Sequence, residues 1–148
     1  MENVLLDTCS WINLLNEDNN DDLSHLEFWI ENKYINLITH EIIIEEWNNH
    51  KEKGKNQITQ SLKAKYKHAN EVIKKENLFT RKIEPNYKVV DDQIGLIDKI
   101  INSALCLKTT DDIKVYCSDK AVARKAPFHN NSNNTKDALI IYSALKHL

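Results

Sequence analysis

The sequence lacks any long apolar run, which excludes a membrane-spanning helix of about 18 consecutive apolar residues. Its opening, MENVLLDTCSW, also lacks the basic start, apolar stretch and small-residue cleavage site of a secretory signal. Repeats and low-complexity segments are missing too. We therefore expect a protein that remains in the cytoplasm and contacts no membrane.

Cysteine is scarce. Cys9, Cys106 and Cys117 are an odd number at spacings that fit neither a disulfide framework nor a zinc knuckle. This excludes a disulfide-stapled fold, and we expect reduced, buried thiols.

What is present is the composition of one globular domain. The chain has 148 residues, of which 41% are hydrophobic and 28% are charged. This length suffices for one core and is short for two domains. The balance of apolar and charged residues is typical of a folded protein in water.

Charge is distributed unevenly along the chain. The net charge is −2, but residues 51–75 contain eight lysines and two glutamates, which gives +6 there and −8 elsewhere. Such a stretch could bind nucleic acid by neutralising phosphates, or it could be the solvated face of a helix.

Apolar runs predict two strands. Residues 3–6 form a short apolar run that ends at Asp7, and residues 34–38 form a second. One helix is expected just after Asp7 and another from about 21 to 32. After the second strand, Thr39 is the predicted cap of a helix that begins HEIIIEEW.

Apolar residues three and four apart predict the remaining helices, at 58–77, at 90–105, from Asp111 or Asp112 to about 123, and from Thr135 onward. Gly54 is expected to separate the first of these from the helix before it. The predicted core includes Trp11, Trp29 and Trp47, and on the last helix Ala138, Ile141, Tyr142 and Leu145. Two strands make a marginal sheet, so a further strand is expected to be hidden in the middle or to lie beyond the C-terminus.

Three acids occupy informative positions. Asp7 ends the first strand, Glu46 lies in the first turns of the helix after the second strand, and Asp137 begins the last helix. In open α/β sheets, sites form beyond the carboxyl ends of the strands. Carboxylates gathered there need a compensating cation, and hard oxygen ligands select Mg²⁺ or Mn²⁺.

Each acid also has an ordinary interpretation, because capping and the helix dipole favour acids in a first turn. Asp7 is the exception. It follows the apolar run Val4, Leu5 and Leu6, where a buried, unpaired charge would be costly.

Three motifs resemble those of the PIN domain ribonuclease family. VLLDTCSWINLLN is similar to the family's opening, in which a strand ends in a metal-binding Asp and a small hydroxyl residue, here Asp7 and Thr8. INLITHEIIIEEW resembles the second motif, with Glu46 before Trp47, and NNTKDALIIYSAL resembles the third, with Asp137. The preceding APFHNNSN is similar to a Pro-Phe loop of a bacterial PIN-like subgroup.

Glu45 is a neighbouring alternative to Glu46. Positions 43, 46 and 47 share one helical face, whereas 45 turns away from it, so we assign the role to Glu46.

The resemblance implies a single domain over residues 1–148, a helix-rich α/β three-layer sandwich with a central parallel sheet flanked by helices. It also implies an endoribonuclease in which Asp7, Glu46 and Asp137 hold Mg²⁺ or Mn²⁺ for hydrolysis of RNA. Thr8 would orient a metal-bound water or the Asp7 carboxylate, or would simply cap the first helix. Lys136 would help to hold the RNA backbone.

One departure leaves alternatives open. PIN domains normally continue after the third motif into further strands, the first of which often carries a fourth acid, whereas this sequence ends at Leu148. The chain is then the N-terminal part of a longer protein, or its site has three acids and its sheet lacks the C-terminal strands. The alternative function is an inactive PIN-like module that binds RNA or protein. A toxin-like nuclease restrained by an inhibitory or companion protein is a third, and the oligomeric state is open, a homodimer included.

Overall fold

The computed structural model describes residues 2–15, 20–76, 82–128 and 134–147. Its centre is a parallel sheet in the order β1 (Glu2–Leu5), β2 (Ile35–His40) and β3 (Leu105–Leu107). The expected helix-rich α/β fold is thereby confirmed. The predicted hidden strand is β3, which begins at Leu105, a residue that the apolar pattern had assigned to the preceding helix.

The register of the sheet aligns the ends of its strands. Leu5 of β1 pairs with Ile38, and Leu107 of β3 pairs with His40. Because all three strands are parallel, their carboxyl ends lie at one edge, from which α1, α3 and α5 begin.

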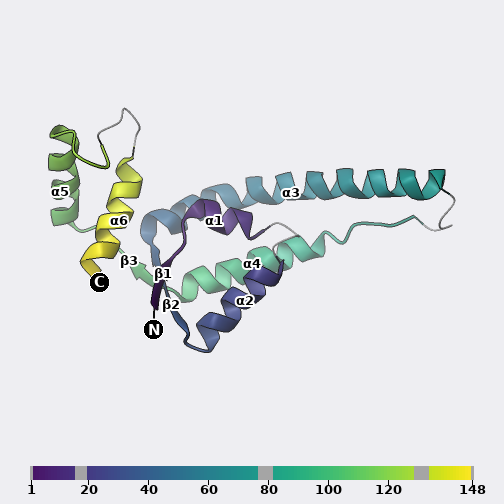
Figure 1. The fold of residues 1–148 in the computed structure, drawn as a ribbon, viewed down its shortest axis with the longest axis horizontal. Helices are drawn as coiled ribbons and strands as arrows, with labels where there is room; N and C mark the ends of the chain where they lie inside the picture. Colours follow the sequence, from purple (N-terminus) through teal and green to yellow (C-terminus); the bar gives the residue numbers. More distant parts are fainter. Residues whose placement is uncertain (1, 16–19, 77–81, 129–133, 148) are drawn as a thin grey trace.

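Helices link the strands and flank the sheet (Figure 1). They are α1 (Thr8–Asn13) and α2 (Asn20–Glu31) between β1 and β2, α3 (Glu41–Lys75) and α4 (Lys88–Ser103) between β2 and β3, and then α5 (Asp111–Val122) and α6 (Thr135–His147). In Figure 1, α1, α2 and α4 lie to the right of the sheet and α5 and α6 to its left. The helix α3 extends far beyond the sheet. Among the described residues, no helix is both long and apolar enough to cross a membrane.

The prediction that Gly54 separates two helices is wrong, because α3 is continuous through it. A Cβ atom at Gly54 would lie 3.4 Å from Leu15 Cδ1 and 3.6 Å from Ile12 Cγ2. The glycine therefore allows α1 to approach α3 closely, and this packing offsets its low helix propensity.

The main core lies between the sheet, α1, α3 and α4. Trp11, Leu15, Ile43, Trp47 and Ile97 are almost completely buried there. A smaller cluster of Ile113, Cys117 and Ala138 joins α5 to α6.

Several expected core residues are exposed instead. Trp29 is 48% exposed, because α2 buries Leu23 and Leu26 and turns Trp29 outward. Ile141 and Leu145 are also exposed, because α6 packs through its small residues Ala138 and Ser143. The thiols of Cys9 and Cys106 are exposed and only Cys117 is buried, which corrects the expectation of three buried thiols.

Polar contacts fix α4 on α3. Asp98 of α4 accepts hydrogen bonds from Trp47 Nε1 at 2.7 Å and from Lys51 Nζ at 3.0 Å. One turn farther along, Lys55 pairs with Asp91 at 2.5 Å. The first lysines of α3 thus serve to hold two helices together.

The packing at Gly54 gives a test. Gly54→Ala should raise the free energy of unfolding by about 0.5–1 kcal/mol, because a methyl group fits and alanine favours helix. Gly54→Leu should lower it by about 1–3 kcal/mol, because a longer side chain would overlap α1. Denaturant unfolding measures both.

Gly95 in α4 provides the control, since a Cβ atom there meets nothing within 4 Å. Gly95→Leu should therefore be tolerated. Equal destabilisation by leucine at both positions would contradict the close approach of α1 to α3.

Candidate functional site

Asp7 lies just past the end of β1 and caps α1. Its backbone is extended (φ −77°, ψ 170°), and its Oδ1 accepts hydrogen bonds from Ser10 N at 2.7 Å and Ser10 Oγ at 2.5 Å. These bonds lower the pKa of the Asp7 carboxyl, the side-chain bond contributing most. The side chain is exposed, so the expected burial cost at Asp7 is wrong.

The sequence had suggested that Thr8 caps α1 or orients the Asp7 carboxylate. In the described contacts Thr8 does neither, because Asp7 itself is the N-cap. Thr8 is buried at the first helical position, and its Oγ1 donates a hydrogen bond to Glu46 Oε2 at 3.0 Å. Residues 38 positions apart are thereby joined across α1 and α3.

Glu46 is also joined to α6. Its Oε1 accepts a hydrogen bond from Lys136 Nζ at 2.7 Å. The Lys136 ammonium, and to a smaller degree the Thr8 hydroxyl, hold the pKa of Glu46 below its ordinary value. Glu46 is therefore ionised at neutral pH, and its two oxygens contact the neighbours of Asp7 and of Asp137.

Asp137 lies in the first turn of α6 and is exposed. It receives no hydrogen bond or ion pair from the part of the chain that is described. Glu45, the alternative to Glu46, is exposed on the same helix, and no hydrogen bond joins it to the described residues of α1 or α6.

His40 connects the end of β2 to the surrounding elements and was not anticipated from the sequence. Its ring is fully buried, and Nδ1 accepts from Ile42 N at 3.2 Å, so His40 and not Thr39 caps α3. The proton of the neutral ring is then on Nε2, which lies 3.1 Å from Ser143 Oγ of α6 and 3.4 Å from Thr109 Oγ1. Burial lowers the pKa of His40 and favours this neutral form.

The three motifs thus meet at the carboxyl edge of the sheet, with Glu46 between the other two. Their carboxylates do not form a ligand set as they stand, because the described residues contain no group of three or more His, Cys, Asp or Glu that could hold a metal ion. A lysine ammonium supplies the counter-charge to Glu46 instead. The donors are nevertheless of the right chemistry, since all are hard carboxylate oxygens and Asp7 Oδ2 accepts no bond from described residues.

These contacts could not be predicted from the sequence. The pairing of Lys136 with Glu46 spans 90 residues, whereas Lys136 had been expected to contact the RNA backbone. The only local signal was Ser10, three residues after Asp7, which is the spacing of a helix N-cap contact.

The cap at Asp7 predicts different effects for two substitutions. Asp7→Asn should leave the free energy of unfolding nearly unchanged, because asparagine caps helices as well as aspartate does. Asp7→Ala should lower it by about 0.5–2 kcal/mol through loss of the cap. Denaturant unfolding of both variants is the measurement, and a large loss with asparagine would show that the charge itself is structural.

Comparison with known proteins gives one family. A family model described as PIN domain matches residues 4–148. Searches of curated proteins and of solved structures found no match. PIN domains are generally nucleases and typically bind divalent metals. Because the match covers essentially all of its length, this chain belongs to the PIN domain family.

Proposed function

We propose that this chain is a divalent-metal-dependent endoribonuclease that hydrolyses RNA phosphodiester bonds, with Asp7, Glu46 and Asp137 as its metal ligands. The observation that carries the proposal is the position of Glu46. One of its oxygens contacts Thr8, the neighbour of Asp7, and the other contacts Lys136, the neighbour of Asp137. Three segments distant in sequence are held at one place by one carboxylate.

The residues present can supply a site for Mg²⁺ or Mn²⁺. Asp7 is an exposed carboxylate at the carboxyl edge of the sheet, and Asp137 is an exposed carboxylate in the first turn of α6, next to the Lys136 that contacts Glu46. When bound there, such an ion would lower the pKa of a water and offset charge on the phosphoryl oxygens. Thr8 fixes the orientation of Glu46 through Oε2, which prepares that carboxylate for its role.

Lys136 has two partners available. It neutralises Glu46 in the structure described, and its side chain is 63% exposed. A divalent cation bound to Glu46 would displace the Lys136 ammonium, which could then contact a phosphate of the RNA. The same residue serves as counter-charge without metal and as a phosphate contact with it.

A second candidate is an inactive PIN-like module that binds RNA or protein. The Glu46–Lys136 pair favours it, because an acid already neutralised by lysine needs no metal. The exposed Ile141 and Leu145 on α6 would offer a partner protein an apolar surface.

Cleavage of a labelled single-stranded RNA tests the proposal. Cutting should require Mn²⁺ and stop in EDTA. Asp7→Asn, Glu46→Gln and Asp137→Asn should each lower the rate by more than about 100-fold, because loss of a metal ligand costs more than loss of a residue that orients one.

Glu45→Gln is the matched control, since it removes one exposed carboxylate from the adjacent position of α3. It should keep the wild-type rate. RNA left intact with Mn²⁺ by a folded wild-type protein would favour the inactive module. Loss of cutting in Glu45→Gln but not in Glu46→Gln would assign the metal ligand to Glu45.

A further inference from the structure

We propose that the distal half of α3 and the returning segment 82–87 form a groove that binds the backbone of single-stranded RNA, at a distance from the three acids. This rests on the proposed RNA substrate. It assigns a second contact surface, centred on Lys63, Lys67 and Lys74, that anchors the strand.

The lysines of α3 fall into two groups. Near the sheet, Lys51 and Lys55 are paired with Asp98 and Asp91 of α4. The helix α4 begins only at Lys88, and α3 extends beyond it (Figure 1). Of its lysines there, Lys63, Lys67 and Lys74 form no ion pair with α4 among the described residues.

Lys63, Lys67 and Lys74 belong to this second group. All three are exposed, and none forms an ion pair with any residue that the structure describes. Spacings of four and seven residues place them on one face of α3, over about 16 Å of helix at ~1.5 Å per residue. Glu71 lies between the last two lysines, so this face of α3 carries an excess of positive charge.

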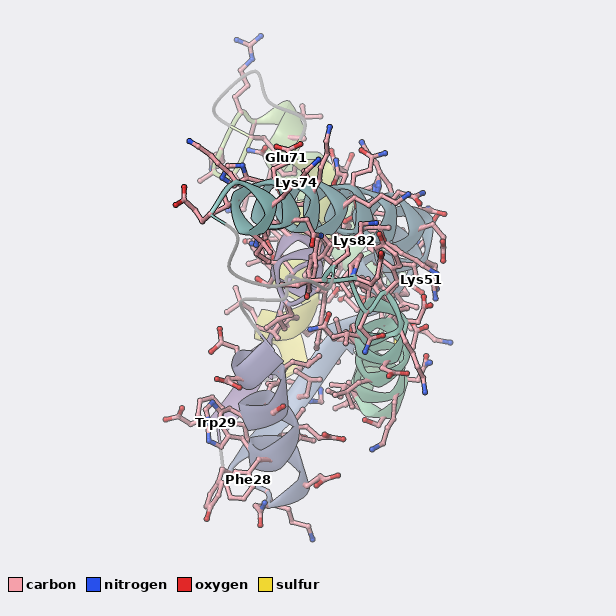
Figure 2. The ribbon with its side chains drawn as sticks, turned by 90° about the vertical axis from the view of Figure 1, so that its right-hand side faces the viewer. Phe28, Trp29, Lys51, Glu71, Lys74 and Lys82 are labelled. Atoms are coloured by element: carbon pink, nitrogen blue, oxygen red, sulfur yellow. The ribbon has the colours of Figure 1, made fainter. Side chains whose placement is uncertain are left out.

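The segment 82–87 is held beside that row by Asn70. Its Nδ2 donates to Ile83 O at 2.7 Å, and its Oδ1 accepts from Ile83 N at 2.8 Å. These two hydrogen bonds engage both backbone groups of Ile83, as a neighbouring β-strand would. The segment 82–87, which forms the opposite wall of the groove, is thereby fixed to α3. Figure 2 shows Glu71 and Lys74 on α3, with Lys82 on the segment that passes beneath it.

The groove has a volume of about 370 Å³ and an uneven charge. Four lysines and two glutamates line it, and Lys82 is neutralised by Glu84 at 2.8 Å. The remaining lining charges are three lysines against Glu71. The groove therefore attracts anions.

Aromatic and apolar surfaces in the groove favour nucleic acid over an acidic peptide. Tyr66 and Tyr87 line it, and Tyr87 is 37% exposed. Ile83 adds a partly exposed apolar side chain. Lysines beside aromatic rings suit a single strand, because phosphates meet the lysines while unpaired bases stack on the rings.

The position of the groove suggests how it serves the acids. Glu46 and Lys63 lie on the same helix, about 26 Å apart at ~1.5 Å per residue. A strand that contacts both runs along α3. The groove would then raise affinity for long strands without taking part in the chemistry.

Binding of a fluorescent single-stranded RNA in EDTA, followed by anisotropy at several salt concentrations, tests the groove. The triple variant Lys63→Gln, Lys67→Gln, Lys74→Gln should bind at least about tenfold more weakly than wild type. The slope of log affinity against log salt should fall by about 2, because about 0.7 counterion is released per phosphate contact on single strands.

The control variant, Lys33→Gln, Lys108→Gln, Lys125→Gln, makes the same change in net charge at exposed lysines outside the groove. It should bind nearly as wild type. Equal losses in both variants, unchanged RNA affinity in the first, or binding of poly-glutamate but not of RNA would overturn the proposal.

The test separates this inference from the nuclease itself. RNA binding through these lysines without any cutting in Mn²⁺ would support the groove and contradict the proposed nuclease activity. Cutting by the triple lysine variant with unchanged RNA affinity would contradict the groove alone.

Discussion

The Glu46 carboxylate is the contact on which the arrangement of the site depends. Each of its oxygens accepts a hydrogen bond from a different element, one from Thr8 of α1 and one from Lys136 of α6. The parallel register of β1 and β2 makes this possible, because it places the start of α1 and the start of α3 at the same edge. His40 adds a second, buried link from that edge to Ser143 of α6.

The long helix α3 relates the site to the rest of the molecule. Its first turns carry Glu46, its next turns are fixed to α4 through Asp98 and Asp91, and its distal half carries the lysines of the groove. Gly54 allows α1 to pack closely against this helix. One continuous helix thus carries both the proposed acidic site and the proposed basic groove, which accounts for the uneven charge of the sequence.

Local patterns in the sequence predicted much of this fold and part of the site. Short apolar runs located β1 and β2, although only β2, the central strand, is buried along most of its length. They missed β3, since only Ala104 separates its three residues from α4 and Leu105 continues the helical spacing. Trp29 was misplaced because a large apolar residue at the margin of a helical face can turn either way.

What the sequence could not show is pairing over long distances. The positions of Asp7, Glu46 and Asp137 followed from their elements, but the partners of Glu46 lie 38 and 90 residues away. The exposure of Asp7 and the burial of His40 likewise depend on how helices pack after the chain has folded. The spacing of apolar residues along the sequence carries no information on these long-range contacts or on the burial that results from them.

Glu46 is proposed to belong to a metal site at which Lys136 supplies the compensating positive charge when no ion is bound. The most direct measurement is the melting temperature of the wild type and of Lys136→Gln as a function of Mn²⁺ concentration, since a ligand of the folded state stabilises it by mass action. Mn²⁺ should raise both melting temperatures and should act at lower concentration on the variant, which has lost a competing cation. No effect of Mn²⁺ on either protein, or weaker binding by the variant, would contradict this proposal.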